Sequence, residues 1–116
     1  MTATVPEQPR IPQPPTTVTA LRQAVGQIAP AALPAFTREL DQAADQARQG
    51  SDLAPLQRFT TQWAVYVEIQ RRPAVAERFR ELEDLAATGA AQARRAAAEL
   101  GRILDEALAD LTEGRR

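Results

Sequence analysis

The chain has 116 residues and a formal net charge of −1, and it contains neither Cys nor His. This length suits one domain with a modest core, and the near-zero charge gives no overall attraction to nucleic acid or to anionic membranes. Without Cys and His the chain cannot form disulfides, Ser-His or Cys-His nucleophiles, or zinc sites built on those residues.

The N-terminal stretch is rich in proline, with five prolines among residues 1–16. Proline lacks a backbone N–H and has a restricted φ, so neither a helix nor a central strand is expected there. We predict a disordered or polyproline II tail. Its prolines also fit the P-x-x-P spacing of segments that dock in aromatic grooves. That spacing arises almost automatically in proline-rich sequence, and we prefer the solvated tail.

Four helices are predicted between Thr17 and Thr88. Ala, the best helix former, is the commonest residue, and apolar residues recur every three or four positions. Threonines can cap the first helix, Pro30 stops it, and Gly50 suits the position just after the second helix. Pro73 separates the third helix from the fourth. The predicted helices cover residues 17–28, 34–49, 53–72 and 73–87.

The stretch Leu53–Arg72 organises the predicted core, because it carries the only Trp, the only Tyr and one of three Phe residues. Its apolar residues cover a wide arc of the helix, which is typical of a helix buried by neighbours on more than one side. We therefore expect it to be the central helix of a small bundle. Truncation of Trp63 to Ala should cost about 3–5 kcal/mol of stability.

A long amphipathic helix is predicted over residues 90–111. Apolar residues recur there in steps of four and three, as in one seam of a coiled coil. The sequence leaves two geometries open: a continuous helix from Pro73, or a hinge at Gly89. The seam can pack back on the core, or it can project and bind a partner's groove or its own copy. The seam residues are Ala93, Ala97, Leu100, Leu104, Ala107 or Leu108, and Leu111.

These elements predict an all-α fold, a small helical bundle of about four helices with a long amphipathic C-terminal helix. The expected organisation has three parts, a disordered proline-rich tail (1–16), a helical core (17–88) and the amphipathic helix (89–116). No run of about 18 apolar residues and no signal-peptide core is evident, so we expect a cytoplasmic protein without a membrane span.

The sequence is compatible with three function classes. The leading prediction is a non-enzymatic interaction protein that binds a protein partner, or its own copy, through the C-terminal helix. The alternative is a DNA-associated dimeric regulator, since the monomer has a poor match to DNA-binding motifs. An enzyme using Asp and Glu alone is the third, and no cofactor or metal is expected. The predicted partner-binding residues are Leu100, Ile103, Leu104, Leu108 and Leu111. The alternative would use Arg71, Arg72, Arg94 and Arg95 for nucleic acid.

Residues 18–82 resemble a family of small uncharacterised actinobacterial proteins, a domain of unknown function. The matching residues include Leu21-Arg22, the run Phe36–Leu40, and Asp52–Pro55 followed eight residues later by Trp63. The exclusive use of Arg for Lys also suits a GC-rich actinobacterial genome. The resemblance implies a partner of a small toxin, an antitoxin-like role, and it leaves out the helix after Gly89.

Overall fold

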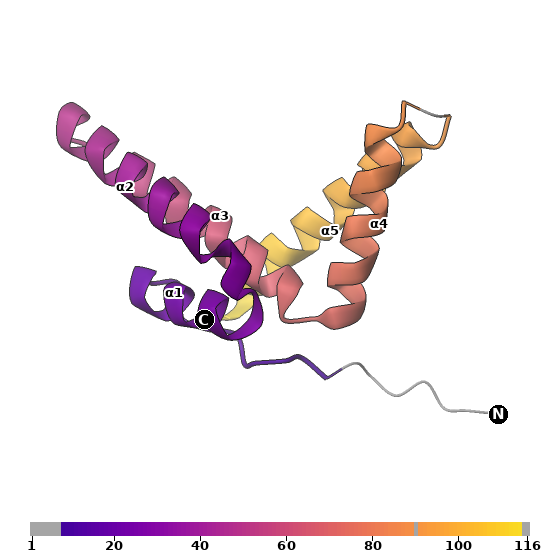
Figure 1. Cartoon of the computed structure of the whole chain (residues 1–116), viewed down its shortest axis with the longest axis horizontal. Helices are drawn as coiled ribbons and strands as arrows, with labels where there is room; N and C mark the ends of the chain where they lie inside the picture. The colour runs from indigo at the N-terminus through magenta and orange to yellow at the C-terminus, as the bar shows by residue number, and fades with distance from the viewer. Residues whose placement is uncertain (1–7, 90, 115–116) are drawn as a thin grey trace. The chain divides into compact units, whose positions relative to one another are not determined.

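A computed structural model describes residues 8–89 and 91–114 of the chain. The described residues form helices and no strand, so the predicted all-α fold is confirmed (Figure 1). The helix bounds are as follows: α1 Val18–Ile28, the 3₁₀ turn η1 Pro30–Ala32, α2 Leu33–Gly50, α3 Ala54–Gln70, α4 Pro73–Ala87 and α5 Ala93–Gly114.

The chain divides into two compact units. One unit comprises residues 13–68 and holds α1, η1, α2 and all but the last two residues of α3. The other comprises residues 1–12 and 69–116 and holds α4 and α5. The turn between α4 and α5 lies inside the second unit.

The helix ends follow local capping chemistry, with one correction. The predicted threonine cap is Thr17, whose Oγ1 accepts a hydrogen bond from the Ala20 amide at 3.2 Å. The residue after α2 was expected to be Gly50, but Gly50 is the last helical residue and Ser51 takes the left-handed conformation, with φ of 50°. Ser51 donates its N–H to the carbonyls of Ala47 and Arg48, and the Asp52 amide also donates to the Ala47 carbonyl, so carbonyl groups at the helix end are paired.

An aromatic cluster fills the core of the first unit. The Phe36 ring is 0% exposed and lies 5.0 Å from both the Phe59 ring and the Trp63 ring, edge-on to each. Trp63 in turn meets Tyr66 edge-on at 5.0 Å, and burial raises the pKa of the Tyr66 phenol above its ordinary value. The prediction that Leu53–Arg72 carries the core aromatics therefore holds for α3, although Leu53 itself is 66% exposed. The hub of the cluster is Phe36, on α2.

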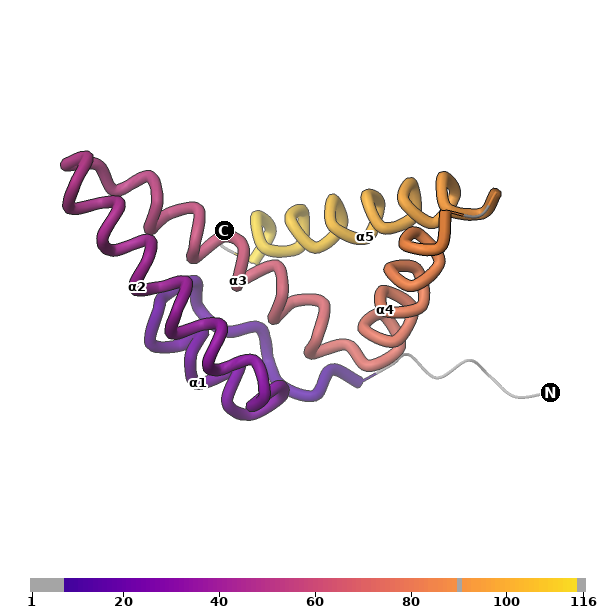
Figure 2. Tube along the Cα trace, turned by 45° about the horizontal axis from the view of Figure 1, so that its top comes forward, coloured from indigo at the N-terminus to yellow at the C-terminus, as the bar shows by residue number. Residues whose placement is uncertain are grey.

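In the second unit, α4 and α5 pack against each other as a helical hairpin (Figure 2). A short turn joins them, and α5 runs back at an angle to α4. Gly89 lies in this turn with φ of +71°, a left-handed conformation that glycine adopts without a Cβ clash. Of the two geometries left open by the sequence, the structure therefore has the hinge at Gly89.

Part of the predicted proline-rich tail is held by hydrogen bonds. In the second unit, the Arg10 amide donates to the Arg71 carbonyl at 2.6 Å, and Arg71 Nη1 donates to the Ile11 carbonyl at 3.3 Å. In the first unit, Gln13 Nε2 donates to Glu68 Oε1 at 3.2 Å. The polyproline II conformation forms no regular hydrogen bonds along its own backbone, so the amides and carbonyls of such a segment can pair with other groups. Here they pair with the buried Arg71. The remaining tail, residues 1–7, lies outside the described residues.

Candidate functional site

The apolar side of α5 is the candidate functional site, and the structure divides its predicted residues into two sets. Leu111 is buried, with 5% exposure, while Leu100 and Ile103 are half-buried. Leu104 and Leu108 are exposed, at 38% and 42%. The five predicted partner-binding residues therefore do not form one uniformly available surface.

The buried line of α5 is rotated from the predicted seam. Besides Leu111, the buried residues are Ala96 and Ala107, whereas the predicted seam residue Ala97 is exposed. At 100° of rotation per residue, Ala97, Leu104 and Leu108 fall within about 40° of one another, beside the buried line. The apolar arc is thus wider than its buried part. We call these three exposed residues the outer stripe.

Two other large apolar residues in the described chain are exposed, Leu53 in the first unit and Leu85 on α4. Each is the only exposed leucine of its segment, and scattered single residues of this kind are normal on protein surfaces. Leu104 and Leu108 differ from them because they are four positions apart on one helix, which makes them neighbours. The outer stripe therefore contains a pair of adjacent leucines and not one isolated large side chain.

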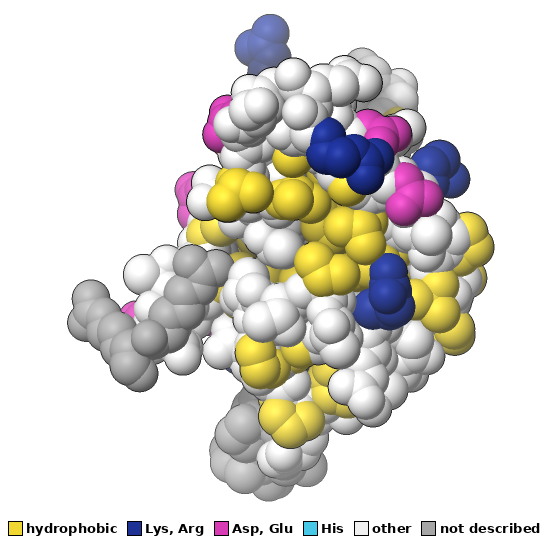
Figure 3. Space-filling view, turned by 90° about the vertical axis from the view of Figure 1, so that its left-hand side faces the viewer, with side chains coloured by type: hydrophobic (Ala, Val, Ile, Leu, Met, Phe, Trp, Pro, Cys, Tyr) yellow, Lys and Arg dark blue, Asp and Glu magenta, His cyan; other side chains and the backbone are white. Residues whose placement is uncertain are grey.

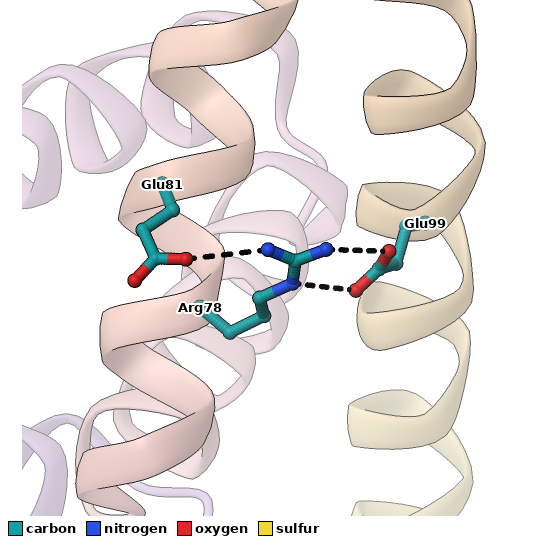
Figure 4. Close-up of polar contacts among 3 residues, drawn as sticks. All are labelled: Arg78, Glu81 and Glu99. Carbon is teal, nitrogen blue, oxygen red and sulfur yellow. Dashed lines mark hydrogen bonds and ion pairs between the residues drawn. The ribbon is translucent and has the colours of Figure 1, made fainter. Parts of the chain in front are cut away.

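An ion-pair network links α4 to α5 (Figure 4). The Arg78 guanidinium donates from Nε to Glu99 Oε2 at 2.9 Å and from Nη2 to Glu99 Oε1 at 3.1 Å, a two-point contact. Its Nη1 also donates to Glu81 at 3.2 Å, an i,i+3 pair within α4. The contact with Glu99 was not predicted, because sequence spacing does not show which residues of two helices face each other.

The network shifts the ionisation of both partners. The hydrogen bond from Arg78 lowers the pKa of the Glu99 carboxyl, and the hydrogen bond to Glu99 raises the pKa of Arg78. Both side chains are accessible to solvent, so the pair adds little to stability. Its two-point geometry nevertheless favours one register of α5 against α4, and that register determines which residues of α5 face outward.

The basic residues of the DNA-binding alternative are not assembled into one surface. Arg71 is only 7% exposed and donates to the Ile11 carbonyl, whereas Arg94 and Arg95 are exposed on α5. Arg72 is half-buried at the start of α4. Because α4 lies between them in the chain, the two arginine pairs lie near opposite ends of this helix, which is about 22 Å long.

The described residues contain neither a metal-binding cluster nor a membrane-spanning helix. Within residues 8–89 and 91–114, no group of three or more His, Cys, Asp or Glu side chains is placed to hold a metal ion. None of the described helices combines the length and the apolar character that crossing a membrane requires.

Comparison with known proteins identifies a family. No curated protein and no solved structure matches the chain. A family of unknown function, DUF6247, matches residues 7–108. This match runs well beyond the predicted resemblance at 18–82, and it includes α5 as far as Leu108, so the expectation that the family pattern ends before this helix was wrong. The chain belongs to the DUF6247 family, whose function is unknown.

Proposed function

We propose that the protein is a non-enzymatic, cytoplasmic interaction protein that binds a protein partner through the outer stripe of α5, in the manner of an antitoxin. The observation that carries this proposal is the exposure of two adjacent leucines, Leu104 and Leu108, on a helix whose apolar arc exceeds its buried part. An amphipathic helix whose apolar face is partly exposed can dock into a hydrophobic groove of a partner.

The size of the stripe limits what it can contribute. Full burial of a leucine side chain is worth about 1.5–3 kcal/mol, and each of these two side chains has roughly two fifths of its surface still exposed. Covering that remainder adds about 0.6–1.2 kcal/mol per leucine. The pair together therefore supplies about one to two powers of ten in affinity.

A stable complex needs more than this stripe. Specific interfaces bury about 800 Å² on each partner, so the surrounding polar side chains must form the rim. Several exposed charged residues lie along α5 beside the stripe, namely Arg94, Arg102, Asp105 and Glu106. In this proposal they select the partner by charge, while the leucines anchor the centre of the contact.

The proposed mechanism is occlusion. A toxin that binds α5 in its active-site groove would be unable to admit substrate while the helix remains in place. Such inhibition requires binding and no chemistry by this chain, and the toxin would recover its activity when the complex dissociates.

The test is neutralisation of a defined partner, the protein encoded by the adjacent gene. That protein is expressed from an inducible promoter with or without this chain, and both growth and co-purification of a stoichiometric complex are measured. We expect the wild-type chain to restore growth and to form the complex. The double variant Leu104→Glu/Leu108→Glu should lose both, because a carboxylate cannot be buried in an apolar groove without a large cost.

A matched control variant separates the stripe from general surface effects. Leu85→Glu changes a leucine of the same 38% exposure on α4 and should retain neutralisation. Point substitutions are preferable to removal of residues 90–116, because that deletion would also remove the helix against which α4 packs. Retained neutralisation by the stripe variant would refute the proposal, and so would a wild-type chain that only forms dimers through the stripe.

A further inference from the structure

A second candidate site is the groove between α2 and α3 in the first unit. The two helices run side by side as an antiparallel hairpin, which Figures 1 and 2 both show. The groove between them has a volume of about 490 Å³. Its floor includes the buried residues Ala43 and Phe59, and its walls are polar.

Two arginines from opposite helices border this groove, Arg38 on α2 and Arg58 on α3. Both are exposed, and neither forms an ion pair within the part of the chain that the structure describes. The groove also contains one carboxylate, that of Glu39, which accepts a hydrogen bond from Trp63 Nε1 at 3.2 Å. The groove lining therefore has two positively charged guanidinium groups and only one carboxylate, which already accepts the hydrogen bond from Trp63.

Three glutamines, Gln42, Gln46 and Gln62, complete the polar wall. A primary amide both donates and accepts hydrogen bonds, so it can pair with the N–H or the C=O of a peptide backbone. Guanidinium groups bind carboxylates with two parallel hydrogen bonds. The groove therefore combines groups for a peptide backbone with groups for acidic side chains.

The length of the groove indicates how much peptide it holds. Its lining extends from Arg38 to Gln46 on α2, about 12 Å, and from Pro55 to Gln62 on α3, about 10 Å. An extended chain advances about 3.3 Å per residue, so the groove accommodates roughly three or four residues. On the face of the molecule that Figure 3 shows, arginine and acidic side chains border hydrophobic ones.

We propose that the α2–α3 groove binds a short, extended acidic segment of a protein partner, with Arg38 and Arg58 holding its carboxylates and the glutamines pairing with its backbone. This site is separate from the outer stripe of α5, and its occupation does not depend on the proposed antitoxin-like role. Since both arginines lie at the open edge, binding weakens as salt concentration rises.

The test uses fluorescein-labelled peptides and the full chain, with fluorescence anisotropy as the readout. A tetraglutamate peptide should bind saturably, and a tetraglutamine peptide should bind at least about tenfold more weakly, because it lacks the charge that pairs with guanidinium. The double variant Arg38→Gln/Arg58→Gln should weaken tetraglutamate binding by a similar factor. The control Arg48→Gln/Arg80→Gln removes the same charge outside the groove and should leave binding unchanged.

A charge reversal provides an independent measurement that a folding defect cannot imitate. Arg38→Glu/Arg58→Glu should lose the tetraglutamate peptide and gain saturable binding of tetralysine. Circular dichroism checks that each variant remains helical. The proposal is overturned if tetraglutamate does not bind, if the control variant loses as much affinity as the groove variant, or if oligothymidylate competes as well as the peptide, which would indicate a general polyanion surface.

Discussion

Replacement of Phe36 should have the largest effect of any single side chain in the aromatic cluster. Its ring is fully buried and lies at 5.0 Å from two other rings, so no solvent or flexible segment can fill the space that its removal leaves. The guanidinium of Arg22 also lies 5.6 Å from the ring centre and would lose a cation–π contact.

The magnitude follows from these contacts. Phe36→Ala should lower the free energy of unfolding by about 3–5 kcal/mol, the range for truncation of a buried aromatic ring. Phe36→Leu retains most of the volume but loses two edge-on ring contacts of about 0.5–1.5 kcal/mol each, so it should cost about 1–3 kcal/mol. Domains of this size are stable by about 5–15 kcal/mol, so the leucine variant should remain folded enough to measure.

The assay is urea unfolding followed by the fluorescence of Trp63, the single tryptophan of the chain, and by far-ultraviolet circular dichroism. Thr37→Ala, at the exposed neighbouring position, serves as the control and should change stability by no more than about 0.5 kcal/mol. A loss below about 1 kcal/mol for Phe36→Ala, or a loss equal to that of the control, would refute the role of Phe36 as the hub of the cluster.

Two further predictions concern the second unit. Gly89→Ala and Gly101→Ala should act in opposite directions on the urea midpoint. An added Cβ would meet nothing within 4 Å at either site. Gly89 has a left-handed φ that costs alanine about 1–2 kcal/mol, whereas Gly101 lies in α5, where alanine should stabilise the helix by about 1 kcal/mol. Midpoint shifts of the same sign for the two variants would contradict this prediction. Because the pKa of Glu99 is lowered, its contribution to stability is present above the ordinary carboxyl pKa of 4.5 and is lost as pH falls through the lowered value. In a plot of melting temperature against pH, Glu99→Gln should therefore make the decline at acid pH less steep. An unchanged decline would show that the contact with Arg78 adds nothing to stability.

The helices themselves could be predicted closely from the sequence. Apolar spacing, Thr17 as a cap and the prolines at 30 and 73 act within a few residues, so they place α1 to α4 to within about three residues without reference to any distant contact. The limits of local reasoning appear at Ser51. Which residue turns left-handed depends on where the next segment must go, and the glycine rule alone placed it one position too early.

The candidate site shows the same division more sharply. Helical periodicity is a property of the chain, so the sequence alone predicts an amphipathic helix with leucines on one side over residues 90–111. Burial along this helix depends on the folded chain: Leu111 is buried, whereas Leu104 and Leu108 are exposed. The burial of Arg71 and the contact of Arg78 with Glu99 likewise depend on segments that are distant in sequence. The physical reason is that the apolar arc of this helix is wider than the surface that packs against it, so either edge of the arc could be the buried one. Packing between segments that are distant in sequence determines which edge is buried.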